Sequence, residues 1–372
     1  AVGMSALTAN TTGTNGVAIG FQASLSNTTG GQNTSLGWNA FGTNTTGSDN
    51  TALGKRALHA STTANNNTAV GANSLLLNTT GLQNTAVGAL SLDANTTGSY
   101  NAALGEKSLS TNILGSKSTA VGTFSLFNQN PASAVDMYNV AVGYDAGNAV
   151  TTGVQNTLIG GLAGDAQTTA SNNTGVGYQA LTAATTGANN TATGMNSMSA
   201  NTTGGSNVAV GGSALGANTT ASNNVAVGND ALTANTTASN NVAVGTNALL
   251  TNTTGTQNVA LGTGAGERIT TGGYNICLGY VAGAHAIHLA TGSQNIIIGP
   301  YADVTDADVS SANVIGYNVS GGGGYTTLGN ASDDIRAAHG NVTWATVSDQ
   351  RYKKDIVDST AGLSFINALQ PR

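Results

Sequence analysis

The chain is built from near-identical copies of one short sequence, and this repeat limits what it can fold into. The consensus is N-[TV]-A-V-G-x-x-[AS]-L-x-x-N-T-T-G-x-x, whose positions we number 1 to 17, and we call each copy a rung. Glycine occupies position 5 of 18 rungs, from Gly3 to Gly299, and Ala or Ser occupies position 8 of the same rungs. The rung from Ser118 has four extra residues, the rung from Asn275 three and the rung from Asn295 one. A helical repeat needs two helices and hence over about 30 residues, whereas ~17 residues fit one coil of a β-solenoid.

Each rung contains its own structural signals. The run T-A-V-G predicts a short strand, positions 8–10 (231–233 in one rung) predict a second, and N-T-T-G predicts the turn that closes the rung. We expect the position-5 glycine to form a positive-φ corner or a close backbone approach. Asn at position 1 should form a ladder of side-chain amides along the axis. At about 4.8 Å per rung, 18 rungs give a rod on the order of 85 Å long.

The rung also favours self-association. Ala at position 3 and Val at position 4 are neighbours in a strand, so they point to opposite faces, and both are apolar. A strand that is apolar on both faces is normally buried on both. We therefore predict an all-β parallel β-solenoid or β-roll in which parallel copies wind about a common axis and close by cyclic symmetry. We expect an intertwined homotrimer, although this argument alone requires only more than one chain.

Composition excludes several other classes of protein. Only 7% of residues are charged, and ten Lys and Arg face sixteen Asp and Glu, so the basic footprint of a nucleic-acid binder is missing. A single cysteine excludes a disulfide scaffold. Apolar runs fall well short of the roughly 20 residues of a membrane span, so we expect no membrane insertion.

The N-x-A-V-G rungs of residues 1–312 resemble the head repeats of trimeric autotransporter adhesins and, more closely, the repetitive shafts of phage tail fibres and spikes. The adhesin repeats are usually shorter than the rung of this chain. The resemblance implies a parallel β-roll trimer with an adhesive role.

The C-terminal end differs from the rungs in charge and pattern. Residues 331–372 hold five of the ten Lys and Arg, and four glycines at 321–324 mark a break in the repeat. We therefore divide the chain into a solenoid shaft at 1–312, a neck at 313–347 and a C-terminal segment at 348–372. Because the chain begins within a rung without a start methionine and ends at Arg372, soon after the last segment starts, we expect a fragment of a longer protein, cut at both ends.

Two linked motifs, S-D-Q-R-Y-K-K-D-I from Ser348 and G-L-S-F-I-N-A-L-Q-P from Gly362, resemble the start of the endosialidase-type intramolecular chaperone domain of phage spikes and fibres. The resemblance implies chaperone-assisted trimerisation and then self-cleavage at the Ser348–Asp349 bond. It makes Ser348 the nucleophile and Lys353 its base, a role open to a lysine whose pKa is lowered by burial. The spacing of Leu363, Ile366 and Leu369 predicts a helix in this segment.

The irregular rungs provide the candidate receptor-binding residues, because binding concentrates on loops. Pro131, Asp136 and Tyr138 lie in the first insertion, and His285 and His288 lie in the second. Tolerated insertions explain the same pattern equally well.

Residues that could bind a metal ion are few. No third ligand accompanies the two histidines in sequence, Cys277 takes the core position 3, and a solvated loop explains Asp303, Asp306 and Asp308 better than a cation site. We therefore expect neither a metal nor a cofactor, and no enzymatic activity apart from autoproteolysis.

The predicted function is that of a trimeric phage tail fibre, located in the virion, which contacts tail or baseplate proteins and a host-surface receptor, glycans included. One alternative is a bacterial or other secreted surface adhesin. Another is an ice-binding solenoid, suggested by the Thr-Thr pair in 14 rungs. Adjacent threonines of a strand point to opposite faces, which weighs against ice binding.

Overall fold

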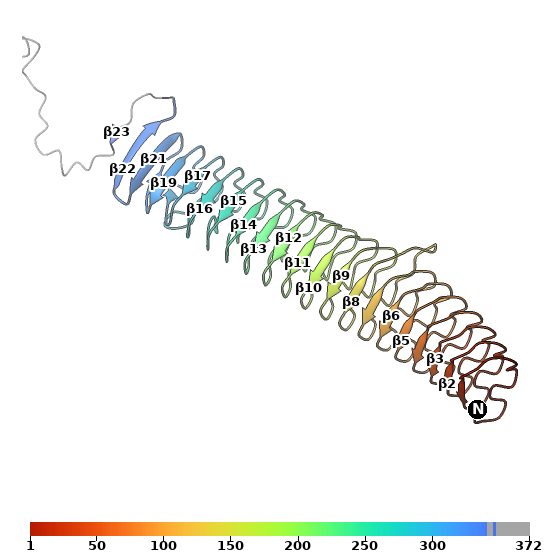
Figure 1. The fold of residues 1–372 in the computed structure, drawn as a ribbon. Helices are drawn as coiled ribbons and strands as arrows, with labels where there is room; N and C mark the ends of the chain where they lie inside the picture. The colour runs from red at the N-terminus through yellow and green to blue at the C-terminus, as the bar shows by residue number, and fades with distance from the viewer. Residues whose placement is uncertain (341–344, 347–372) are drawn as a thin grey trace, which may run out of the picture.

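The computed structural model describes residues 1–340 and 345–346 as a gently bowed rod, in which one short strand per rung lines one side and turns line the other (Figure 1). No helix occurs among these described residues. The 17 rung strands are β1 (Val17–Ile19), β2 (Thr34–Leu36), β3 (Thr51–Leu53), β4 (Thr68–Val70), β5 (Thr85–Val87), β6 (Ala102–Leu104), β7 (Thr119–Val121), β8 (Val140–Val142), β9 (Thr157–Ile159), β10 (Thr174–Val176), β11 (Thr191–Thr193), β12 (Val208–Val210), β13 (Val225–Val227), β14 (Val242–Val244), β15 (Val259–Leu261), β16 (Ile276–Leu278) and β17 (Ile296–Ile298).

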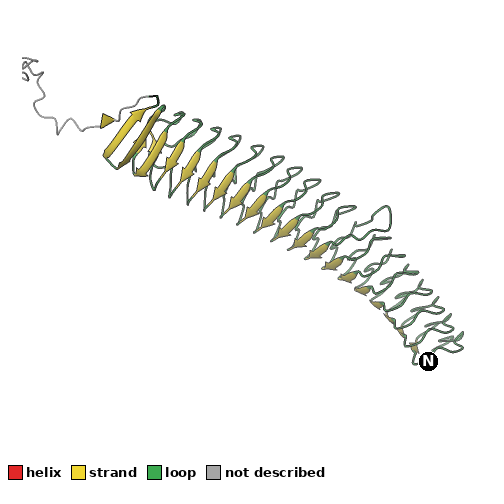
Figure 2. Ribbon diagram, turned by 45° about the horizontal axis from the view of Figure 1, so that its top comes forward, coloured by secondary structure: helices red, strands yellow, loops and turns green. Residues whose placement is uncertain are grey.

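The strands pair in parallel with each residue on its own copy in the next rung. Val208 pairs with Val225, which in turn pairs with Val242 one rung further on. The insertions after Ser118 and Asn275 leave the pairing intact, since Thr119 pairs with Val140 and Ile276 with Ile296. The prediction of an all-β parallel solenoid with one coil per rung is confirmed. Figure 2 shows the strands as one continuous stripe along the rod.

The second strand predicted at positions 8–10 is wrong. In the rung of β13 these residues lie in consecutive turns, because Asp230 and Leu232 adopt left-handed backbone conformations with φ of 56° and 53°. The backbone there still bonds from rung to rung, with the amide of Leu232 donating to the carbonyl of Ala248 at 3.0 Å. Inter-rung hydrogen bonds therefore continue through turns that are not extended.

The position-5 glycine meets both of its expected requirements. Gly228 has φ of +139°, and a Cβ placed on it would lie 2.5 Å from the carbonyl oxygen of Gly245 in the next rung. Any larger residue would therefore be strained in its backbone and would clash with the neighbouring rung.

Two asparagine ladders run through the interior of the rod. At position 1, Oδ1 of Asn190 accepts from the backbone amide of Asn207 at 3.0 Å, as the sequence predicted for this column. At position 12, Nδ2 of Asn218 donates to Oδ1 of Asn201 at 2.8 Å and to the carbonyl of Ala221 at 3.1 Å. The second ladder was not predicted, because N-T-T-G by itself indicates only a turn.

The core is thin and is filled by position 3, position 8 and the leucine at position 9. Where glycine replaces that leucine, a larger residue elsewhere takes the space. Gly164 lies against Leu158, which replaces Ala at position 3, and a Cβ on Gly164 would be 2.7 Å from Leu158 Cδ2. Cys277 and Ile297 likewise occupy position 3 beside Gly283. Side-chain volume is thus conserved from rung to rung, as close packing requires.

Positions 2 and 4 point outward, while position 3 between them is buried in every strand from β1 to β17. The outward residues are Thr, Val, Ile, Leu and Ala, and none is charged. One face of the sheet is therefore an exposed stripe with a large aliphatic content, as the sequence argument anticipated.

The parallel ladder continues beyond residue 312. β19 (Asn313–Tyr317) pairs with β17 and with β21 (Tyr325–Asn330), after which β22 (Asp333–Ala338) and β23 (Ala345–Thr346) add antiparallel strands. A small second sheet joins β18 (Asp303–Val304) to β20 (Ser320–Gly321). The expected shaft boundary at 312 therefore falls inside a continuous sheet. The extra residue expected in the rung from Asn295 is also wrong, because Ala312 takes the position-1 place and donates its amide to Asn295 Oδ1 at 2.9 Å.

Candidate functional site

The first insertion, residues 130–138, leaves the rod between β7 and β8 and is fixed at its base. The backbone of Ser116 donates to Val135 at 3.0 Å and accepts from Met137 at 2.9 Å, and the Met137 side chain is fully buried. Buried Gln129, which replaces the position-12 Asn, accepts from Asn139 Nδ2 at 2.9 Å and donates to Asn112 Oδ1 at 3.2 Å. Gln129 therefore links the start of the loop to asparagines of both ladders.

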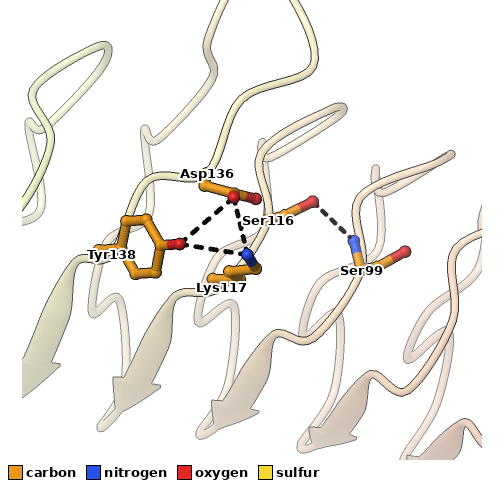
Figure 3. A network of polar contacts seen from close by, with 5 residues as sticks. All are labelled: Ser99, Ser116, Lys117, Asp136 and Tyr138. Atoms are coloured by element: carbon orange, nitrogen blue, oxygen red, sulfur yellow. Dashed lines mark hydrogen bonds and ion pairs between the residues drawn. The ribbon is translucent and has the colours of Figure 1, made fainter.

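Three exposed polar side chains meet beside this loop (Figure 3). Lys117 Nζ lies 2.7 Å from Asp136 Oδ2 and donates to the Tyr138 hydroxyl at 3.1 Å. The Tyr138 hydroxyl donates to the same carboxylate at 3.3 Å, and the ammonium lies 5.2 Å from the Tyr138 ring centroid. We call Lys117, Asp136 and Tyr138 the polar triad.

The triad is built on neighbouring copies of position 17. Lys117 and Tyr138 both occupy it with positive φ, and Tyr100, 54% exposed, occupies it one rung earlier. Hydrogen bonding to Asp136, and then to Tyr138, raises the pKa of Lys117 above its ordinary value. Exposed tyrosines therefore occupy the position-17 column in the rungs on either side of the Lys117 ammonium, an arrangement that offers flat apolar faces beside donors and acceptors.

Of the three residues predicted in this loop, the structure brings Asp136 and Tyr138 to the surface and buries Pro131. Lys117 was missed because it lies well before Asp136 in the sequence, on the other side of the inserted residues. Its place in the position-17 column, one rung before Tyr138, is the signal that could have identified it.

The second insertion carries the two predicted histidines in different surroundings. His285 is exposed and packs against the Tyr301 ring at 4.7 Å, whereas Nδ1 of His288 is buried without a partner. The backbone amides of Ala286 and Ile287 donate to Oδ2 of Asp303, at 2.7 and 3.1 Å. Asp303 is 1% exposed, so the expectation of a solvated loop is wrong for this residue. Its carboxylate instead holds the backbone of the insertion in the preceding rung.

An aromatic strip lies beside this second loop and was not predicted. Tyr280 packs edge-on against Tyr301 at 5.3 Å, and Tyr301 against Tyr317 at 5.8 Å. Tyr280 and Tyr317 are about half exposed, at 49% and 52%. Tyrosines that follow position-5 glycines, or lie close to them, in successive rungs are a sequence signal that could have found the strip.

The two loops are separate sites. The rungs that carry them start at Ser118 and Asn275 and are nine rungs apart, which is roughly 40 Å along the axis.

Within 1–340 and 345–346, no three His, Cys, Asp or Glu side chains gather in a way that could hold a metal ion. Cys277 is fully buried, as predicted for a core residue, and burial raises the pKa of its thiol to about 12. The described part of the chain also has no helix long and apolar enough to cross a membrane.

The threonine pairs divide into two columns with different uses. Oγ1 of Thr202 at position 13 donates to the carbonyl of Thr219 in the next rung at 3.0 Å, and this contact recurs along the rod. The position-14 threonines, such as Thr220, are exposed. The position-13 hydroxyls are hydrogen-bonded within the rod, so only the position-14 column exposes unbonded threonines. A single column of exposed threonines gives little support to ice binding.

Ser348, Lys353 and the predicted helix at 362–369 lie outside the described residues. Comparison with protein-family models found no match, and neither curated proteins nor solved structures gave one.

Proposed function

We propose that this chain is the shaft of an adhesive fibre, a phage tail fibre that assembles as a homotrimer and attaches the virion to its host surface. The observation that carries the proposal is a narrow rod of stacked rungs with two fixed insertions about 40 Å apart, each beside a cluster of aromatic and polar side chains. A shaft of this kind would set the distance between the virion and the host surface, and its loops would contact the receptor.

The motif pair from Ser348 supports assembly through a C-terminal chaperone that is then released. With Lys353 as base, the Ser348 hydroxyl would form an ester with the carbonyl carbon of the Ser348–Asp349 bond, and Lys353 would return the proton to the leaving Asp349 amine. Water would then hydrolyse the ester and leave a carboxylate on Ser348. In the full-length gene product we expect a released C-terminal fragment on denaturing gels. Ser348→Ala and Lys353→Ala should abolish its release, while Ser364→Ala, a serine between the motif residues, should not. Release from Ser348→Ala would refute the assignment.

Host-surface attachment is supported by the polar triad and the aromatic strip, since aromatic faces beside hydrogen-bonding groups suit sugar rings. We propose a cell-surface receptor that includes a glycan, with tail or baseplate proteins as the second class of partner. Labelled protein should bind host cells, and Tyr138→Ala or Tyr301→Ala should weaken that binding at least tenfold. Tyr178→Ala changes a tyrosine that lies in neither loop and is exposed at 53%, close to the 49% of Tyr138, so it is the matched control for Tyr138→Ala. Equal binding by all three variants would refute the role of the loops.

A further inference from the structure

The outward residues of β12 to β17 form the most apolar regular surface of the described rod. All positions 2 and 4 in these six strands are Val, Ile or Leu, among them Val210 at 38%, Val259 at 37% and Leu261 at 51% exposure. We call these outward residues the aliphatic face. In β2 to β11 the same stripe carries threonine at position 2 in eight strands, beside Val, Leu, Ile or Thr at position 4.

Exposed aliphatic side chains in such number need a cover, because a parallel sheet is usually buried on both faces and large apolar patches mark interaction surfaces. Seventeen strands of three residues give a stripe about 80 Å long and about 10 Å wide, from ~4.8 Å between strands and ~3.3 Å per residue. Its area of roughly 800 Å² equals what one partner contributes to a typical stable interface.

The single chain already completes its core, which indicates where a partner would bind. Ala209, Leu215 and Ala226 are fully buried without any second chain. A second copy therefore has no core to complete and would add only by covering the outside of the sheet.

We infer that the aliphatic face packs against the same face of the other copies of this chain, all parallel and in register around one axis along the rod. This rests on the proposed fibre and names the surface that joins its chains. An identical face repeats with the identical inter-strand spacing, so side chains of one copy can sit between those of the other along the whole stripe. The uncharged stripe also matches the charge depletion at the centre of protein interfaces.

The parallel orientation follows from the difference between the two halves of the stripe. Parallel copies place the aliphatic face on itself and threonines near threonines, where hydroxyls can bond to one another. Antiparallel copies would place Val and Ile against the threonine half.

Charge substitution tests the surface. Sedimentation equilibrium should show a multimer for the native chain and a monomer for Val227→Lys with Val244→Lys, with unchanged circular dichroism. Thr220→Lys with Thr237→Lys places the same charges at exposed position-14 sites and should leave the multimer intact. A multimer that survives the valine changes overturns the inference but leaves the fibre proposal standing, whereas a monomeric native chain overturns both.

Cross-linking tests the orientation and does not depend on how the lysine variants fold. Single-cysteine substitutions Val227→Cys and Leu278→Cys place thiols three strands apart on the aliphatic face, and native Cys277 stays buried. In an oxidised mixture, each variant should cross-link to its own kind. Predominant mixed cross-links, or none from a native-like multimer, would refute parallel packing.

Discussion

The asparagine ladder at position 1 makes a quantitative prediction at Asn224. Its Oδ1 accepts from the backbone amide of Asn241 at 2.9 Å, and its Nδ2 donates to the carbonyl of Ala238, also at 2.9 Å. In Asn224→Ala the Ala238 carbonyl keeps a second donor, Asn235 Nδ2, but the Asn241 amide is buried without a partner. The orphaned Asn241 amide costs about 1–3 kcal/mol, and loss of the Asn224 Nδ2 hydrogen bond to Ala238 adds ~1 kcal/mol. We therefore expect the local free energy of unfolding to fall by about 2–4 kcal/mol.

Native-state hydrogen exchange is the suitable assay, because rungs contact only their neighbours and a solenoid need not unfold in one step. Protection of the Asn241 amide should fall by a factor of about 30 to 1,000, from ~1.36 kcal/mol per tenfold. Asn223→Gly is the control, since Asn223 is exposed at φ of 61°, which glycine also adopts, and its change should stay within about 1 kcal/mol.

Asn224→Asp separates the two halves of the ladder contact. The aspartate keeps the acceptor for Asn241 but turns an oxygen toward the Ala238 carbonyl, so burial and this contact should raise its pKa in the folded state. Because the aspartate pKa is higher in the folded state than in the unfolded state, the stability of the variant is highest below the unfolded pKa of about 3.9. That stability is lost as the pH rises through the folded pKa. We therefore expect the Asn241 amide of Asn224→Asp to be protected nearly as in the native chain at pH 4. At pH 7 its protection should fall at least as far as in Asn224→Ala. Native protection of Asn224→Asp at pH 7, or an alanine loss below about 1 kcal/mol, would refute the reasoning.

Three further predictions concern other positions. Gly228→Ala should lower the free energy of unfolding by at least about 3 kcal/mol in thermal unfolding, because its positive φ strains an alanine and the new Cβ would lie 2.5 Å from the Gly245 carbonyl oxygen. In the control Gly212→Ala the new Cβ meets only the end of the Asn229 side chain, so the loss should stay under about 1 kcal/mol. Cys277, buried and with its pKa raised to about 12, should resist iodoacetamide at pH 8 until the chain unfolds; rapid native labelling would contradict this. Burial lowers the pKa of His59 below 6.5, so stability should fall as pH drops from 7.5 to 5.5, and His59→Gln should lose this dependence in denaturant titrations.

The repeat predicted the strand, the stacking register and the position-1 ladder, because these depend on identical residues lying above one another. It did not predict the conformation of positions 7 to 9. Leucine rarely adopts positive φ, yet Leu232 does so at 53°, because the turn lets its side chain enter the core while its amide bonds to the next rung. Local residue preference thus gave way to inter-rung bonding and burial.

The candidate sites were predicted in part, for a related reason. Irregular rungs located both insertions, but contacts between rungs depend on register, so the pairing of Lys117 with Asp136 was not visible along the sequence. Asp303 appeared to belong to an acidic loop, whereas its buried carboxylate organises the backbone of the preceding rung. Partners one rung apart become predictable once each residue is assigned a position from 1 to 17.

The constant rung gives the shaft a graduated scale. Adding or deleting one consensus rung, such as that of β13, would change the separation of the insertions by ~4.8 Å and would again pair each strand residue with its own copy. Homologous recombination between near-identical coding repeats makes such whole-unit changes easily, and the ladders accept them without new side chains. The reach of the molecule can therefore be adjusted in small, equal increments while the loops that it carries stay the same.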